Sequence, residues 1–243
     1  MLQFTEESTF NDSPWAIIGS SKARLVQATP NIDSSCAYVA RVSSKNQENP
    51  SVKGLLRYCA KEGHWSVFEQ GSLTIEVVTP LAIAIQLIRH RSFCFQQFSG
   101  RYQDQTAMGD VTAGLPAAAK MFYLPTVGRR QDTKNRQNSI VSEDGIFTDK
   151  MVATMEEAYI CAHKAYTHLI DMGVAKEIAR FVLPEGVYTR LYMTGSPRSF
   201  IHYLSVRDDE GVAQWEHVEL ARAVAEVFMD ECPLISSVVF GDE

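Results

Sequence analysis

The chain has 243 residues, a length that suits one domain with a substantial hydrophobic core. Hydrophobic residues make up 45% of it and charged residues 21%, as is ordinary for a soluble globular protein. The formal net charge of -6 argues against a protein that coats nucleic acid, although a local basic pocket could still hold a small anionic ligand. We therefore expect a single domain, 1–243, that does not bind nucleic acid.

Cysteine use and the N-terminal sequence indicate a cytoplasmic protein. The five cysteines are widely spaced and include no CxxC pair, so we expect reduced thiols, no disulfide framework and no metal site. The first residues, MLQFTEESTF, have neither a basic start nor an apolar stretch, so a signal peptide is not expected. The most apolar run, 81–88, is too short for a membrane span, which needs roughly 20 apolar residues.

The first part of the chain alternates between predicted strands and helices. Asp33 and Ser34 have the residue types of a helix N-cap. Asn49 followed by Pro50 predicts a second helix start, and Gly63 predicts its end. The predicted elements are a strand at 23–28, a helix from 33–34 to 43, a helix from 49–50 to 63, a strand at 72–78 and a buried helix at 81–88 opened by Pro80.

The second part begins with weak signals over 107–149, including the polar stretch 128–138, and we expect a surface excursion there. No strand is followed by GxGxxG or GxxxxGK[ST], so neither a Rossmann nor a P-loop site is expected. The pattern predicts a helix-rich α+β domain with a modest, mainly antiparallel sheet. Its later elements are helices at 151–172, 176–182, 196–204 and 213–230 and a strand at 188–193. Cys232-Pro233 closes the last of these helices.

The segment 89–102 is locally basic in an acidic protein. Its sequence, RHRSFCFQQFSGRY, holds three arginines and one histidine, and no acidic residue stands between Glu76 and Asp104. Arginine suits bidentate binding of phosphate, and Ser99 with the backbone at Gly100 adds neutral donors. Glutamine amides can pair with the polar edge of a ring, and the aromatic residues can stack on it or pack in the core. On residue types alone, an anion site and a solvated surface cluster are equally open.

This segment resembles the signature of the flavin-dependent thymidylate synthases, which is Arg-His-Arg, seven residues and Ser. Several ordered blocks make the resemblance more specific than Arg-His-Arg alone, and it implies a homotetramer whose sites are assembled from several subunits. The further blocks that resemble the family are ARVS at 40–43, GHWSVFE at 63–69, IARFVLP at 178–184, YTR at 188–190, PRS at 197–199, Arg207 and AQWE at 213–216.

The resemblance implies reductive methylation of dUMP to dTMP without a cysteine nucleophile. Methylenetetrahydrofolate would donate the carbon, and FAD reduced by NADPH would donate the hydride. Arg207 is the expected catalytic residue, because an arginine at the N3/O2 edge of the pyrimidine favours the ionised ring. The positions that match dUMP contacts are Gln86, Leu87, Ile88, Arg89, Gln97, Phe98, Ser99, Gly100, Arg101, Arg180 and Arg207. Those that match FAD contacts are Ser66, Arg89, His90, Arg91, Gln97, Ser196, Pro197, Arg198 and His202, with Ser43 and His64 in second rank.

Three positions depart from the family pattern. Gln97 stands where an acidic residue is common, Val212 where a histidine is common, and His202 where an asparagine is common. Ser99 is interpreted as a ligand-contacting hydroxyl rather than a nucleophile. Two other functions remain open: a non-enzymatic nucleotide-phosphate-binding protein, and a single-stranded nucleic-acid binder, against which the acidic charge balance argues.

Overall fold

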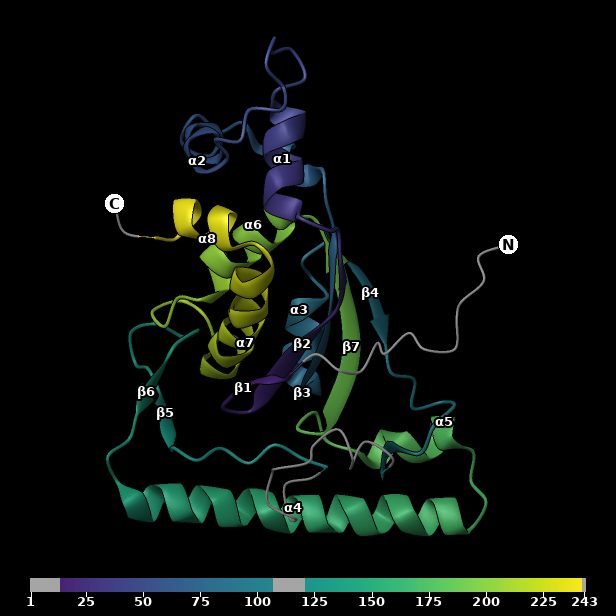
Figure 1. Cartoon of the computed structure of the whole chain (residues 1–243). Coiled ribbons are helices and arrows are strands. Elements are labelled where there is room, and N and C mark those ends of the chain that lie inside the picture. Colours follow the sequence, from purple (N-terminus) through teal and green to yellow (C-terminus); the bar gives the residue numbers. More distant parts are fainter. Residues whose placement is uncertain (1–13, 107–120, 242–243) are drawn as a thin grey trace.

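The computed structural model describes residues 14–106 and 121–241. At its centre lies a five-stranded sheet in the order β1-β2-β3-β7-β4, in which every pairing is antiparallel. Helices α3, α6 and α7 cover one face of this sheet (Figure 1). The strands are β1 (Ala16–Ile18), β2 (Ser21–Ala28), β3 (Leu73–Pro80), β4 (Cys94–Gln97) and β7 (Tyr188–Gly195).

The helices follow the predicted order, so the helix-rich α+β class is confirmed. Helices α6 and α7 pack on the sheet, while α4 lies as a long separate rod beneath it (Figure 1). The helical elements are α1 (Ile32–Ala40), α2 (Lys53–Lys61), η1 (Trp65–Glu69), α3 (Leu81–Leu87), α4 (Gly145–Asp171), α5 (Lys176–Ala179), η4 (Arg180–Val182), α6 (Pro197–Arg207), α7 (Trp215–Glu231) and α8 (Pro233–Val239). Among the described residues, no helix has the length and apolarity that a bilayer crossing requires.

Strand β3 forms the middle of the core because neighbouring strands pair with both of its edges. Ile75 lies opposite Met193 and Val77 opposite Leu191, and all four side chains are fully buried beneath the helices. On the other face, the buried Glu76 carboxylate accepts a 2.8 Å hydrogen bond from Nε of Arg24. Alternation along β3 thus gives the strand one apolar face and one face on which the buried charge of Glu76 is paired with Arg24.

Two predicted helix caps are wrong. Asn31, in the left-handed conformation with φ 51, precedes α1, whereas Asp33 accepts hydrogen bonds from the backbone N–H groups of Leu234 and Ile235 at 2.8 and 3.1 Å. Asp33 therefore satisfies the start of α8, which is distant in sequence. Val52, not Asn49, is the N-cap of α2.

Several elements differ from the sequence prediction. Helix α4 begins at Gly145, inside the expected excursion, because Asp144 caps it by accepting from the Phe147 N–H at 3.1 Å. The polar stretch contains a hairpin of β5 (Arg129–Gln131) and β6 (Ser139–Val141). The helix predicted at 213–230 ends at its C-cap Cys232 as expected, but it is not the last, because Pro233 begins α8; β4 was not foreseen. The part of the excursion at 107–120 lies outside the described residues.

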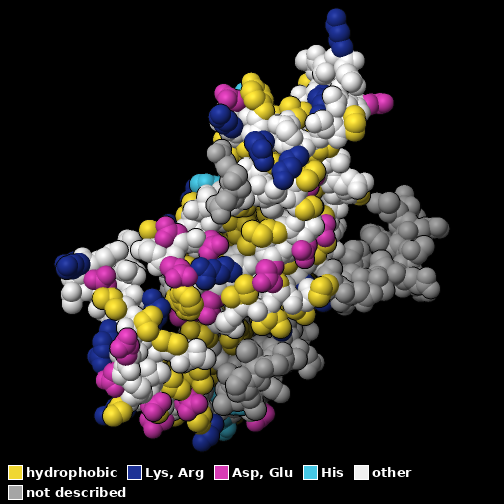
Figure 2. Space-filling model, turned by 60° about the vertical axis from the view of Figure 1, so that its left-hand side comes forward, with side chains coloured by type: hydrophobic (Ala, Val, Ile, Leu, Met, Phe, Trp, Pro, Cys, Tyr) yellow, Lys and Arg dark blue, Asp and Glu magenta, His cyan; other side chains and the backbone are white. Residues whose placement is uncertain are grey.

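Apolar side chains remain exposed on helix α4 and around α5. Ile146, Met172 and Phe181 are 69%, 64% and 77% exposed, and Tyr166 is the buried residue of α4. Hydrophobic side chains are also visible between charged ones on the face drawn in Figure 2. Exposed apolar area of this kind is typical of a surface that contacts another protein.

Candidate active site

Strand β4 carries the middle of the arginine motif along the edge of the sheet. Its register pairs Cys94 with Thr194 and Gln97 with Leu191. Before the strand, the Ser92 carbonyl accepts a 3.1 Å hydrogen bond from the Ser199 hydroxyl at the start of α6. After it, the chain continues through Phe98 to Arg101, next to α5 and η4. The seven residues between Arg-His-Arg and Ser therefore connect two separate places at the two ends of β4.

The first place is a cluster behind the sheet, which we call the arginine–histidine cluster: Gln86, His90, Tyr203, Arg207 and His217. Arg207, in the last turn of α6, donates a 2.9 Å hydrogen bond from Nε to Nε2 of His90. The His90 ring packs against Tyr203 with centroids 5.1 Å apart, and against His217 at 6.3 Å. Nδ1 of His217 lies 3.3 Å from Oε1 of Gln86.

Both histidines of the cluster are held neutral. Burial, with the charge of Arg207 and the proximity of His202, lowers the pKa of His90 to about 4. Burial, Arg207 and His90 lower the pKa of His217 to about 3. A neutral His90 can accept the Arg207 bond at Nε2 without cancelling the guanidinium charge. The cluster therefore presents an oriented cation in a partly dry environment.

The second place, the glycine–arginine corner, consists of Ser99, Gly100, Arg101 and Arg180. A Cβ atom on Gly100 would lie 3.2 Å from Oε1 of Gln105 and 3.6 Å from Cδ of Arg180, so glycine permits this close approach. Arg101 donates from Nε to Glu177 at 3.1 Å, whereas no carboxylate among the described residues forms an ion pair with Arg180. Two guanidiniums beside the Ser99 hydroxyl suit an anionic group such as phosphate.

The third place, the η1–α6 corner, consists of Ser66, Glu69, Ser196 and Arg198. Arg198 donates to Oε1 of Glu69 at 2.6 Å and so connects α6 to η1. The Ser196 hydroxyl accepts from the Ser199 N–H at 3.3 Å, which confirms the predicted cap of α6. Ser66 and Arg198 are both exposed and available to a ligand.

Two further arginines of the motif suit an anionic ligand. Arg89 and Arg91 are exposed, and no carboxylate in 14–106 or 121–241 forms an ion pair with either. Arg89, Arg91 and Arg198 are the guanidiniums of the predicted FAD set, and Ser66 and Ser196 are its hydroxyls. This set suits the two negative charges of a pyrophosphate.

Several predicted residues can contribute only in part. Leu87 is fully buried in the core, so its backbone alone could reach a ligand. Gln97 donates its amide to the Thr189 hydroxyl at 3.1 Å, and Phe98 packs against Val78 and Tyr188. The other placements are His202, exposed on α6; Ile88, 42% exposed; Pro197, buried; Ser43, in the loop after α1; and His64, whose ring lies 5.7 Å from that of Tyr58.

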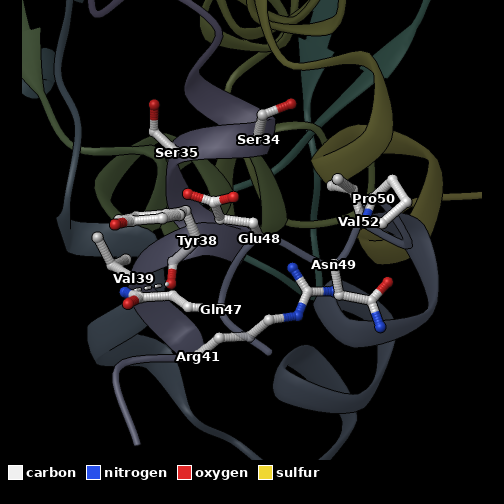
Figure 3. Close-up of a pocket in the computed structure, with 10 residues that line it drawn as sticks. All are labelled: Ser34, Ser35, Tyr38, Val39, Arg41, Gln47, Glu48, Asn49, Pro50 and Val52. Carbon is white, nitrogen blue, oxygen red and sulfur yellow. Dashed lines mark hydrogen bonds between the residues drawn. The ribbon is translucent and has the colours of Figure 1, made fainter. Parts of the chain in front are cut away.

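A pocket of ≈ 670 Å³ opens between α1 and the loop that follows it (Figure 3). Tyr38, Arg41 and Glu48 line it, and none of the predicted ligand-binding residues does. Arg41 donates to the backbone carbonyls of Ala37 and Ser51, so its guanidinium is already bound within the chain. The candidate site therefore lies elsewhere, in the three places described above.

All five cysteines are free thiols. Cys36, Cys59 and Cys232 are buried, and burial raises the pKa of each, that of Cys36 to about 11. A buried thiol with a raised pKa is a poor nucleophile. Cys94 and Cys161 are exposed, the former on β4.

Residues of helix α7 also belong to the arginine–histidine cluster, although sequence reasoning gave them no role. Gln214 is the N-cap of α7, and its Oε1 accepts from Nε2 of Gln86 at 2.7 Å. His217, three residues later, lies on the same helix side and contacts the same glutamine. The i, i+3 spacing of Gln214 and His217, which places both on one side of α7, was the available signal.

Comparisons with known proteins identify the family of the chain. Residues 24–234 match the family described as "Thymidylate synthase complementing protein". A flavin-dependent thymidylate synthase of Synechocystis sp. is 44% identical over 207 residues, covering 84% of this chain and 87% of the relative. Those of Kosmotoga olearia and Thermosipho africanus are 35% and 34% identical, covering 87% and 90% of this chain and 86% and 90% of the relatives. The chain therefore belongs to the flavin-dependent thymidylate synthases and is an enzyme of that family.

Proposed function

We propose that this enzyme methylates dUMP to dTMP, with 5,10-methylenetetrahydrofolate as the carbon donor and NADPH-reduced FAD as the hydride source. The observation that carries the proposal is Arg207, a cation held by a neutral His90 and paired with no carboxylate among the described residues. Carbon transfer to C5 of uracil requires negative charge on the ring. A fixed guanidinium at the N3/O2 edge stabilises that charge, so Arg207 is the proposed catalytic residue.

This route needs no cysteine nucleophile. Attack by a thiol on the pyrimidine would require a thiolate close to a base. Three of the thiols are buried with raised pKa values, as described above. The charged arginine supplies by electrostatics the activation that a covalent sulfur adduct would supply in another enzyme.

The flavin, when bound, supplies the hydride and carries the one-carbon unit. The proposed ligands of its pyrophosphate are Arg89, Arg91 and Arg198, with hydroxyl donors from Ser66 and Ser196. These side chains neutralise and orient the cofactor, and the glycine–arginine corner holds the phosphate of dUMP. Binding, orientation and electrostatic stabilisation are thus the proposed work of the protein.

We also propose a homotetramer with shared sites, and the positions of the two corners support a contribution from a second chain. Arg180 precedes β7 and Arg198 follows it, so the corners lie at opposite ends of a strand of 8 residues. Such a strand spans about 25 Å. The two corners of one chain are therefore too far apart to contact dUMP and FAD stacked on each other. A corner from a second chain could complete the site. Exposed Phe181 and Ile178, at 77% and 53%, provide apolar contact area beside Arg180.

One assay tests the proposed function directly. The purified protein is incubated with dUMP, methylenetetrahydrofolate, FAD and NADPH, and the nucleotide product is separated and quantified. Formation of dTMP is expected, and it should be abolished by omission of dUMP, methylenetetrahydrofolate or NADPH, or by removal of the bound FAD. Purified protein that binds flavin but consumes no dUMP would contradict the proposal, and so would product formation without FAD.

A further inference from the structure

Two residues at the start of α7, Gln214 and His217, contact the side chain of Gln86 on α3. The Gln86 amide donates from Nε2 to Oε1 of Gln214 at 2.7 Å, and its Oε1 lies 3.3 Å from Nδ1 of His217. Gln214 in turn donates from Nε2 to Oε2 of Glu216 at 2.8 Å. The other carboxylate oxygen of Glu216 accepts from the Tyr123 hydroxyl at 3.0 Å. The four α3 and α7 side chains, anchored by Tyr123, form one relay of hydrogen bonds.

The polarity of this relay is decided at Glu216. An ionised carboxylate can only accept hydrogen bonds, so the Gln214 amide has to turn its N–H toward Glu216. The Gln214 carbonyl then faces Gln86, so the Gln86 amide has to donate an N–H to it. The Gln86 carbonyl is left facing His217, whose Nδ1 therefore has to carry the proton. Each orientation follows from the one before it, although a glutamine amide taken alone can point either way.

The far end of the relay is buried. His217 is 0% exposed, and its Nε2 has no hydrogen-bond partner among the described residues. With Nδ1 protonated, Nε2 carries a lone pair that faces the interior of the cluster. Gln86 itself is half-buried and retains one unused N–H. The relay therefore leaves Gln86 with a donor to offer to a ligand, while its carbonyl is turned toward His217.

We propose that Glu216 and His217 are positioning residues that fix the Gln86 amide so that its N–H points at an acceptor oxygen of dUMP. This inference rests on the proposed function, because it assigns Gln86 to the nucleotide. A flipped amide would bring the carbonyl against the anionic nucleotide and would repel it. The relay thus selects a substrate with a hydrogen-bond acceptor at this position, and it acts through Gln86 without touching the substrate.

Two variants of His217 separate positioning from packing. His217→Leu removes the Nδ1 donor but keeps the bulk, and His217→Asn restores an N–H near the position of Nδ1. The dissociation constant for dUMP, measured by calorimetry on FAD-loaded enzyme, should rise about tenfold in the leucine variant, the usual effect of losing one buried hydrogen bond. The asparagine variant should recover most of that loss. Equal affinities in both variants, whether weakened or unchanged, would overturn the proposal.

A third variant removes the other end of the relay without altering the core. Glu216→Gln allows the Gln214 amide to flip, so the KM for dUMP should rise about tenfold while kcat stays within about twofold. Glu226→Gln, an exposed substitution on the same helix, is the matched control and should leave both constants unchanged. A fall in kcat at unchanged KM would contradict a positioning role.

The tautomer of His217 gives a readout that does not depend on the reaction. Long-range proton–nitrogen NMR spectra of histidine-labelled protein distinguish a protonated Nδ1 from a protonated Nε2. We expect protonated Nδ1 in the wild type and loss of that preference in Glu216→Gln. Protonated Nε2 in the wild type would refute the relay. If the wild type failed to bind dUMP, the proposed function would fail, and these spectra would still decide the polarity of the relay.

Discussion

Arg207 and His90, which are 117 residues apart in sequence, meet through a single 2.9 Å hydrogen bond from Nε to Nε2. The acceptor is a neutral imidazole rather than a carboxylate. A carboxylate at this position would hold the arginine equally well but would cancel its charge. The imidazole fixes the direction of the guanidinium and leaves its full charge available to an anionic transition state.

Replacement of this arginine should separate catalysis from cofactor binding. Arg207→Ala should reduce kcat for dTMP formation by at least about 100-fold, the usual effect of removing a group that stabilises developing charge. Arg207→Lys keeps the charge but loses the planar geometry and should retain a small part of the activity. Flavin absorbance of the purified variants should stay at the wild-type level. A normal rate of dTMP formation in Arg207→Ala would rule out the assigned role.

The buried histidines make stability depend on pH. Because the folded pKa values of His90 and His217, about 4 and about 3, lie below the ordinary value of 6.5, the unfolded chain binds protons that the folded chain does not. The free energy of unfolding should therefore fall as the pH is lowered from 6.5 toward 4.

Urea unfolding at pH 7 and pH 5 measures this effect. His217→Asn removes one of the two depressed groups, so its midpoint should fall less between these conditions than that of the wild type. Carboxylates that titrate in the same range are common to both proteins and cancel in the comparison. Identical losses in the two proteins would show that His217 is not buried in neutral form.

Shared sites predict complementation between two inactive variants. Arg207→Ala disables the arginine–histidine cluster, and Arg180→Ala disables the glycine–arginine corner. If a site combines these places from two chains, an equal mixture assembled at random should regain roughly a quarter of wild-type activity, since that share of sites draws both places from intact chains. The two variants are co-expressed with different affinity tags and purified through both.

The control for this mixture is each variant co-expressed with a second tagged copy of itself, which should stay inactive. A mixture as inactive as its components, in complexes shown to contain both tags, would mean that both places serve a site within one chain.

Exposed thiols should be dispensable. Cys94 lies within the motif strand, and Cys161 is exposed on α4. The double variant Cys94→Ser, Cys161→Ser should retain kcat within about twofold, because replacing an exposed side chain without a special contact perturbs little. The measurement is the initial rate of dTMP formation. An inactive but folded double variant would indicate that one of these thiols takes part in the reaction and would argue against purely electrostatic activation.

Local sequence signals predicted much of the fold. Apolar alternation predicted β3 and β7, and the Ser196-Pro197 pair predicted the start of α6. These features succeed because they depend on contacts within a few residues. The cap predicted at Asp33 failed for the opposite reason, since its carboxylate binds backbone about 200 residues away, in α8.

The features of the candidate site also divide into those that the sequence predicts and those that only the tertiary structure shows. The sequence by itself determined the charge of the motif and the family, and it predicted a catalytic role for Arg207, because these depend on residue types and their order. Only the tertiary structure decided that Arg207 is held by His90, and that α7 fixes the amide of Gln86 through His217. The physical reason is that hydrogen bonds are made between neighbours in space, and packing α3, α6 and α7 on one sheet brings together residues more than 100 positions apart.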